Sequence, residues 1–223
     1  MLTEKDRARI MAISTNTVSD AMDALGLRPG ATCGVHHVYE GCKKIVGEAV
    51  TVKIGPTGET PAPSTHLCSE AIALCQPGDI IVVDNGGDRE TSCWGGLLAN
   101  CAQMRQATGV VVDGAVRDVD HFFSCGFPVY ARDAVVRTSR GRIMVYETNG
   151  LIQFCGVQVR PGDIVMADRS GVVIVPREHF AQVLAKAEEL EEKEYNMMSE
   201  VQQGGDMMEV DAKYDYVNML KRK

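Results

Sequence analysis

The stretch GGLLANCAQMRQATGVVVDGAVRD, residues 95–118, decides the fold, because it joins a glycine pair, a helical pattern and an apolar strand that ends in two opposite charges. Apolar residues recur at helical spacing over 96–109, whereas VVVD at 110–113 is typical of a short buried strand. The preceding PGDIIVVDNGG at 77–87 predicts a turn, a second buried strand and a glycine loop. Strand, loop, helix and strand form a βαβ unit, so we expect part of the sheet to be parallel. The apolar stripe of the predicted helix consists of Leu97, Cys101 and Met104.

The chain before this unit predicts two helices and a strand. Residues 14–15 can cap a helix that ends near Gly26, and the segment 28–44 is irregular enough to predict a loop. IVGEAVTVKI at 45–54 has β-branched residues in near alternation, which indicates a strand, and HLCSEAIALC at 66–75 predicts a further helix. The apolar face of the first helix consists of Val18, Ala21, Met22 and Leu25.

The chain after this unit changes to short strands with almost no helix between them, at 127–136, 141–147 and 155–176. A final helix is predicted from Pro176 to about Val201. PGDIIVVD and PGDIVMAD are alike because a Pro-Gly-Asp turn precedes a buried strand in each, so we infer no duplication.

The expected architecture is α/β, in a single domain over residues 1–223. A mixed sheet is predicted to carry helices on one face and to pack on further strands with the other. The C-terminal helix and tail, about 176–223, are predicted to pack on a neighbouring subunit, and the acidic run within that helix is typical of a solvated face.

Composition restricts the classes of partner. The chain has 223 residues, of which 45% are hydrophobic and 24% charged, as expected for a globular protein. A net charge of −7 and a pI of about 5.3 provide no positive field for phosphate backbones, so we expect no nucleic-acid partner. No stretch approaches the roughly 20 apolar residues that span a bilayer, and the charged start does not resemble a secretory signal. We therefore expect a cytoplasmic protein without a membrane partner.

Eight cysteines could indicate disulfides or a metal cluster. They are widely and irregularly spaced with no CxxC pair, whereas structural zinc sites use close pairs of ligands. Several lie in apolar segments, so we interpret them as reduced core residues. The eight are Cys33, Cys42, Cys68, Cys75, Cys93, Cys101, Cys125 and Cys155.

The start of the helix at residue 96 is a candidate anion site. Free N–H groups and the helix dipole favour an anion there, and glycines allow a ligand close to the backbone. The predicted substrate-binding residues are Gly95, Gly96, Leu97 and Leu98, which offer amides but no polar side chain. We infer a small ligand such as a carboxylate. NGGDRETSCWGG lacks the G-x-G-x-x-G pattern, so a dinucleotide is disfavoured.

Arg117 and Asp118 follow the second strand of the βαβ unit, whose carboxyl end lies beside that helix start. Arg117 can grip a carboxylate with two parallel hydrogen bonds, and Asp118 can bind a divalent ion that keeps several waters. Such a site fits a 2-oxo acid chelated by a metal. The competing interpretation is an ordinary ion pair at the end of a strand.

The segment WGGLLANCAQMRQATGVVVDGAVRD at 94–118 resembles the RraA-like family, which contains 4-hydroxy-4-methyl-2-oxoglutarate aldolases and the RraA inhibitors of RNase E. TVSDAMDALG, PGDIIVVDNGG and PGDIVMADRSGVVIVP extend the likeness over most of the chain. The resemblance implies a layered β-β-α domain of the swivelling type, assembled as a homotrimer or homohexamer with active sites between subunits.

The aldolases that this sequence resembles share an Asp-x20-Arg-Asp signature. Carried over, its arginine falls on Arg117, its metal-binding aspartate on Asp118, and the substrate-holding amides on Leu97 and Leu98. Its first aspartate falls on Gly96, where this sequence departs from the pattern. Asp88 or Glu90 in the nearby loop could substitute, although either can be a solvated loop charge. The resemblance also implies acidic residues from an adjacent subunit, for which Glu192 and Glu194 are candidates.

The resemblance implies a lyase dependent on Mg²⁺ or Mn²⁺. The reaction would break a C–C bond of a 2-oxo acid through a pyruvate enolate, either by retro-aldol cleavage or by decarboxylation of oxaloacetate, with Arg117 and Asp118 as the catalytic residues. Retention of Asp118 favours the enzymes over the regulators of the family. The alternative is a non-catalytic regulator that binds RNase E or a helicase. His66, before the predicted helix at 67–75, and the pair His36 and His37 are left out of the predicted site.

Overall fold

The computed structural model describes residues 2–28, 30–59, 66–218 and 220. Within them, eight strands form one mixed sheet, in which β1, β5, β4, β3, β2, β9 and β10 are neighbours in that order and β6 also pairs with β2. The strands of this sheet are β1 (His36–His37), β2 (Ile45–Pro56), β3 (Ile80–Trp94), β4 (Gly109–Val116), β5 (Val129–Ala134), β6 (Ile143–Thr148), β9 (Ile164–Asp168) and β10 (Gly171–Val175). A separate hairpin pairs β7 (Ile152–Phe154) with β8 (Val157–Val159).

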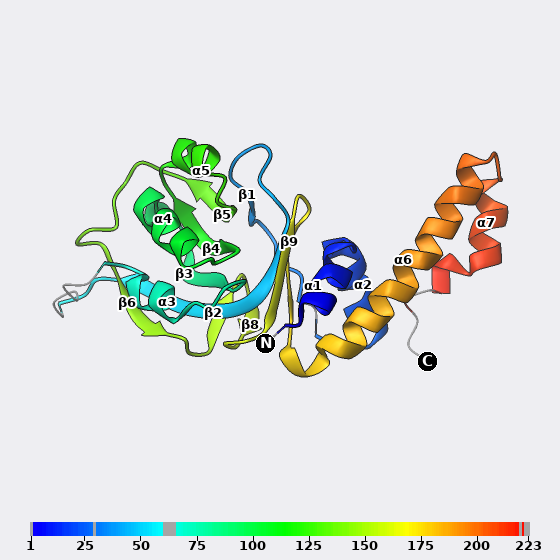
Figure 1. Cartoon of the computed structure of the whole chain (residues 1–223), viewed down its shortest axis with the longest axis horizontal. Coiled ribbons are helices and arrows are strands. Elements are labelled where there is room, and N and C mark those ends of the chain that lie inside the picture. The colour runs from blue at the N-terminus through cyan, green and yellow to red at the C-terminus, as the bar shows by residue number, and fades with distance from the viewer. Residues whose placement is uncertain (1, 29, 60–65, 219, 221–223) are drawn as a thin grey trace.

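The helices fall into two groups. Three lie along one face of the central strands, and the others gather beyond β9 and β10 (Figure 1). The first group is α3 (Ser69–Leu74), α4 (Gly96–Met104) and α5 (Val119–Cys125). The second group is α1 (Glu4–Met11), α2 (Thr15–Ala24), α6 (Phe180–Gln202) and α7 (Met207–Tyr214), with short 3-10 turns at Arg177–His179 and Tyr216–Asn218.

The predicted βαβ unit is confirmed as β3-α4-β4. The pairs β2–β3, β3–β4 and β4–β5 are parallel, and α4 and α5 are the connections on either side of β4. Helix α5 was not predicted, because its seven residues are too few to show a period. The carboxyl ends of β3 and β4 therefore lie together at the start of α4.

The two faces of the sheet are covered as predicted. On one face, Trp94, Leu98 and Phe122 belong to an apolar cluster that joins α3, α4 and α5 to the strands. On the other face, Tyr130 and Phe154 belong to a cluster that includes the β7-β8 hairpin, β9 and β10. The mixed α/β class and the mixed sheet are confirmed.

The strand predicted within 77–87 is confirmed, but the glycine loop predicted to end it is wrong. Strand β3 continues through these glycines to Trp94, with its register against β4 shifted three times. Gly86 and Gly87 adopt φ of +61° and +75°, a backbone that L side chains rarely adopt, so they bend the strand instead of ending it.

The apolar stripe predicted for α4 is wrong at two of its three residues, because only Cys101 packs against the core. Leu97 is 63% exposed and Met104 84% exposed, whereas Leu98, Ala99 and Ala102 are buried against the sheet. Both sets of residues have helical spacing, so periodicity identifies the helix but not its buried face.

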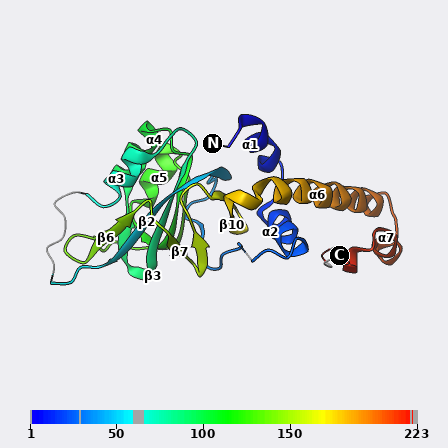
Figure 2. The same cartoon turned by 90° about the horizontal axis from the view of Figure 1, so that it is seen from below.

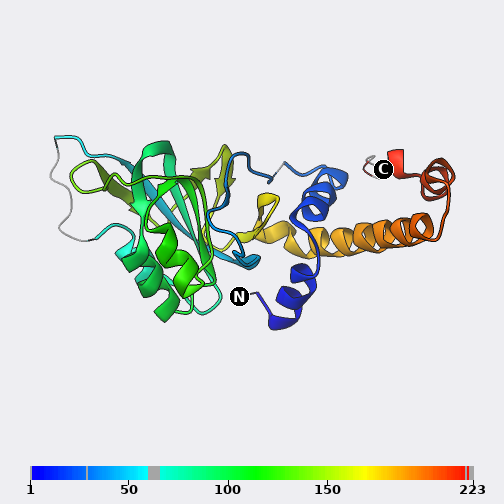
Figure 3. The ribbon, with the colours of Figure 1, turned by 90° about the horizontal axis from the view of Figure 1, so that it is seen from above.

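The ends of the chain pack together on one side. Helix α2 begins at the predicted Ser14 cap, and the predicted C-terminal helix is confirmed as α6. Both bury apolar residues in one cluster with β9 and β10. Beyond this cluster α6 projects away from the sheet and α7 folds back along its far end (Figures 2 and 3).

The two Pro-Gly-Asp turns have the same local chemistry. Asp79 accepts a hydrogen bond from the Gln76 N–H at 2.8 Å, and Asp163 accepts one from the Arg160 N–H at 2.7 Å. This supports turn chemistry as the origin of the likeness. All eight cysteines are free, and four of them are buried, whereas Cys33 is exposed and does not fit the core interpretation. No helix among the described residues is long and apolar enough to cross a membrane.

Candidate active site at the carboxyl ends of the parallel strands

A pocket of about 610 Å³ lies where β3 and β4 end and α4 begins. One wall comes from the end of β3, the first turn of α4 and the two residues after β4. The opposite wall comes from residues 138–141 and from β6. The lining residues are His66, Leu67, Ser92, Cys93, Trp94, Gly95, Leu97, Leu98, Arg117, Asp118, Thr138, Ser139, Arg140, Gly141, Ile143, Met144 and Val145. The structure thus brings Gly95, Leu97, Leu98, Arg117 and Asp118 together, as the sequence predicts.

Asp118 has the left-handed backbone conformation, with φ of +64°, directly before α5. Its Oδ2 accepts a hydrogen bond from the Gly96 N–H at 2.9 Å and lies 3.7 Å from Nε of Arg117. The two side chains are 47% and 38% exposed, so this ion pair is weak, and each group can still bind a ligand. The Arg117 N–H donates to the Trp94 carbonyl at 3.0 Å, which fixes the backbone of the pair to the end of β3.

The amides of Leu97 and Leu98 point from the first turn of α4. Among the described residues neither N–H has a hydrogen-bond acceptor, as expected for the first turn of a helix. The indole N–H of Trp94, which lines the same pocket and is 1% exposed, has no acceptor either. These N–H groups leave the pocket with unpaired donors, which favours an anionic ligand.

Gly96 differs from the other predicted substrate-binding residues, because it does not line the pocket. A Cβ at this position would lie 2.9 Å from Cδ2 of His121. The His121 ring, which is within 3.0 Å of Asn100 Oδ1, fills the space beside Gly96. In this chain an aspartate at position 96 would require His121 to move.

The substitutes suggested for that aspartate have other partners. Asp88 accepts hydrogen bonds from two backbone N–H groups of its own turn, and Glu90 pairs with Arg137 at 2.9 Å. Neither lines the pocket. Glu192 and Glu194 lie on α6, at the opposite end of the molecule from α4 within this chain (Figure 1).

His66 was left out of the predicted site, and sequence reasoning missed the whole opposite wall. His66 lines the pocket, although its Nδ1 is 3.2 Å from the Leu67 carbonyl oxygen. Residues 138–141 reach the pocket because β6 returns antiparallel to β2, a pairing between distant segments that no local pattern shows. His36 and His37 form β1 beside β5, outside this pocket.

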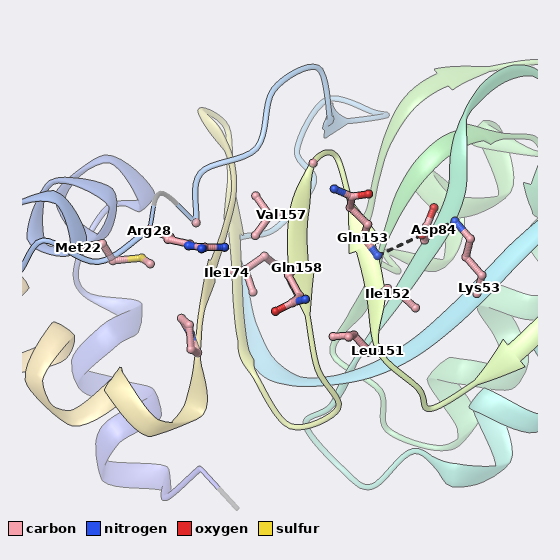
Figure 4. A pocket seen from close by; sticks show the side chains of 13 residues that line it. Met22, Arg28, Lys53, Asp84, Leu151, Ile152, Gln153, Val157, Gln158 and Ile174 are labelled. Atoms are coloured by element: carbon pink, nitrogen blue, oxygen red, sulfur yellow. Dashed lines mark hydrogen bonds and ion pairs between the residues drawn. The ribbon is translucent and has the colours of Figure 1, made fainter.

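A second pocket of about 620 Å³ lies between the β7-β8 hairpin and β10 (Figure 4). Its buried carboxylate, Asp84, accepts from Lys53 Nζ at 2.6 Å and from the N–H groups of Gly86 and Gln153 at 3.0 and 3.2 Å. Asp84 is thus fully engaged in holding the hairpin to the sheet. The pocket at Arg117 and Asp118 is the better candidate active site.

The donor set is compatible with one divalent ion. Asp118 is the one carboxylate among the described residues of the lining, and within the described chain no three His, Cys, Asp or Glu side chains form a metal-binding group. The Oδ1 atom of Asp118 has no recorded partner in the described part of the chain. A Mg²⁺ ion typically binds through one or two carboxylates and keeps several waters, so Asp118 alone could hold it.

Comparisons with known proteins agree with this fold. Residues 15–174 match the family described as RraA-like, Aldolase/RraA. A protein of Halalkalibacterium halodurans provisionally named as 4-hydroxy-4-methyl-2-oxoglutarate aldolase is 31% identical, with 78% of each chain covered. Protein DlpA of Legionella pneumophila is 29% identical over 89% of this chain, which spans only 32% of the length of DlpA.

Two solved structures are similar throughout. An uncharacterized protein of Pseudomonas syringae has a TM-score of 0.87 at 25% identity, with 95% of each chain covered. RraAS2 of Streptomyces coelicolor, described as an unusual member of the RNase ES inhibitor RraA protein family, has a TM-score of 0.78 at 25% identity, covering 88% of this chain and 96% of its own. The chain therefore belongs to the RraA-like family.

Proposed function

We propose that the chain is a divalent-metal-dependent lyase that cleaves a C–C bond of a 2-oxo acid in the pocket of Arg117 and Asp118. The observation that carries the proposal is the convergence on one pocket of a guanidinium, a carboxylate with an oxygen to spare and the unpaired amides of Leu97 and Leu98. The provisional aldolase name of a relative supports the same reaction class.

Arg117 and the amides of Leu97 and Leu98 would bind the substrate, and Arg117 would also stabilise the charge that develops during cleavage. Arg117 would donate two parallel hydrogen bonds to the substrate carboxylate, and the amides of Leu97 and Leu98 would hold the same end of the molecule. Cleavage of the C3–C4 bond leaves its electron pair on the pyruvate fragment, where the Arg117 charge stabilises it. C3 of this fragment then takes a proton from water. The other fragment leaves as carbon dioxide from oxaloacetate, or as a carbonyl compound whose former 4-hydroxyl proton passes to water. A Mg²⁺ or Mn²⁺ ion at Asp118 would supply Lewis-acid stabilisation of the developing enolate.

The test is pyruvate release from oxaloacetate and from 4-hydroxy-4-methyl-2-oxoglutarate, with and without EDTA. We expect EDTA to abolish turnover, and Asp118→Asn and Arg117→Lys to lower kcat/KM by about 10²-fold or more. Asp120→Asn is the matched control, because Asp120 is an exposed carboxylate two residues away that does not line the pocket. Unchanged metal-dependent turnover in Asp118→Asn would show the proposed site to be wrong.

The second candidate is a non-catalytic regulator, which the description of RraAS2 favours. On this alternative no pyruvate is released with any metal, and substitution of Arg117 or Asp118 leaves binding to the partner protein unchanged. The same two variants therefore separate the two functions.

A further inference from the structure

The part of the pocket wall formed by residues 138–141 contains an arginine whose side chain has no partner among the described residues. The segment between β5 and β6 carries three arginines, at 137, 140 and 142. Arg137 pairs with Glu90 at 2.9 Å, and Arg142 donates from Nη1 to the Thr138 carbonyl at 3.2 Å. Arg140 has no side-chain hydrogen bond or ion pair within the described chain, and it alone of the three lines the pocket.

The backbone on both sides of Arg140 is fixed to the sheet. The Ser92 N–H donates to the Arg137 carbonyl at 3.1 Å, and the Thr57 N–H donates to the Arg142 carbonyl at 2.8 Å. These bonds tie the segment to β3 and β2, at the end of the molecule that carries α3 and α4 (Figure 1). Arg140 is thus presented to the pocket by an anchored turn.

The charges of the pocket do not balance without a ligand. Among the described lining residues, Arg117 and Arg140 supply two cations and Asp118 one carboxylate, which already accepts from the Gly96 N–H. Arg117 follows β4 and Arg140 precedes β6, so the two cations reach the pocket from different segments of the chain. A ligand with a carboxylate at each end would satisfy both.

We propose that Arg140 binds the distal carboxylate of the substrate and selects 2-oxo acids with two carboxylates over those with one. This specificity-determining role rests on the proposed function, which places the 2-oxo carboxylate end at Arg117. The planar guanidinium suits two parallel hydrogen bonds to a carboxylate, a geometry that lysine cannot reproduce.

The first experiment measures binding by calorimetry in the presence of Mg²⁺, with 2-oxoglutarate and 2-oxopentanoate as probes. The two have the same chain length and differ in the distal carboxylate. We expect the wild-type protein to prefer 2-oxoglutarate on the order of tenfold. Arg140→Ala and Arg140→Gln should abolish the preference by weakening 2-oxoglutarate alone, whereas Arg140→Lys should retain part of it.

Arg142→Ala is the matched control, because it removes an arginine two residues away that does not line the pocket. It should keep the preference of the wild-type protein. Circular dichroism of each variant checks that the fold is retained. A wild-type protein without preference, a preference that survives Arg140→Ala and Arg140→Gln, or an equal loss for both ligands would each overturn the proposal.

A kinetic measurement separates this inference from the proposed function. With 4-hydroxy-2-oxoglutarate and 4-hydroxy-2-oxopentanoate, Arg140→Ala should raise KM about tenfold for the dicarboxylate only. If the wild-type protein releases no pyruvate from either compound but Arg140 still sets the binding preference, the lyase proposal fails and the carboxylate subsite stands.

Discussion

Gly95 allows the side chains of Arg117 and Asp118 to lie close to the backbone at the start of α4. Its φ of −152° is an extended conformation open to any residue, so the backbone does not require glycine. Glycine is required by the close packing of neighbouring side chains, because a Cβ at position 95 would lie 2.8 Å from Asp118 Oδ2 and 3.3 Å from Cγ of Arg117. The absent side chain lets the Arg117 and Asp118 pair lie against the start of α4.

Gly95→Ala should therefore disturb the site more than the fold. We expect the new methyl group to displace Asp118 and Arg117, lowering kcat/KM for pyruvate release by about tenfold or more, with a loss of stability below about 1 kcal/mol. Gly58→Ala is the control, since its Cβ would meet nothing within 4 Å. Equal activity of both variants and the wild-type protein would contradict this account.

Local sequence predicted one wall of the pocket and not the other. Gly95, Leu97, Leu98, Arg117 and Asp118 follow from a single rule, that the strand ends of a βαβ unit share one edge with the helix start. The sequence could not show that Gly95 lines the pocket and Gly96 does not. That difference depends on α5, which places His121 beside Gly96.

At the scale of elements, strand and helix periods located most segments but not their environment. Helix α4 shows two apolar rows, and the sheet decides that Leu98 and Ala102 are the buried ones. Helix α5 begins at a left-handed Asp118 that gives no side-chain cap, so its start lacks the usual signal. The position of Arg140 depends on the pairing of β6 with β2, which has no local signature.

The contact between α2 and α6 is destabilised by the charge of Glu194, which can be tested. Burial, followed by the neighbouring Glu191 and Asp20 carboxylates, raises the pKa of Glu194. A carboxyl with a raised folded pKa stabilises the fold at low pH, and this contribution is lost as pH rises through the folded pKa. At pH 7 the charged Glu194 therefore opposes the packing of these helices.

Glu194→Gln should remove this cost. We expect Tm at pH 7 to rise by about 1–3 °C, and the gain to shrink as pH falls toward 4, because protonation of the wild-type carboxyl removes the charge that opposes the packing. Thermal unfolding followed by circular dichroism at both pH values measures it. Glu192→Gln is the control, because Glu192 is exposed on the same helix. A lower Tm for Glu194→Gln at pH 7 would refute the argument.

The whole molecule has a body and a projection. The sheet with α3, α4 and α5 forms the body, and the far half of α6 with α7 extends well beyond it (Figures 2 and 3). Met197 and Val210 are buried between these two helices, whereas Tyr195 and Met198 are 74% and 59% exposed. Exposed apolar groups on a projecting helical hairpin are typical of an interaction surface.

The homotrimer or homohexamer that the family resemblance implies is a prediction at this scale. Light scattering after gel filtration should give a mass three or six times the 24.2 kDa of one chain. If the hairpin lies between subunits, replacing Tyr195 and Met198 together by serine should lower that mass, because their apolar surface would no longer be removed from water on assembly. Replacing exposed Val136, which lies on the body, is the control. A wild-type mass of 24.2 kDa would contradict the assembly itself, and an unchanged multiple in the double variant would place the interface elsewhere on the molecule.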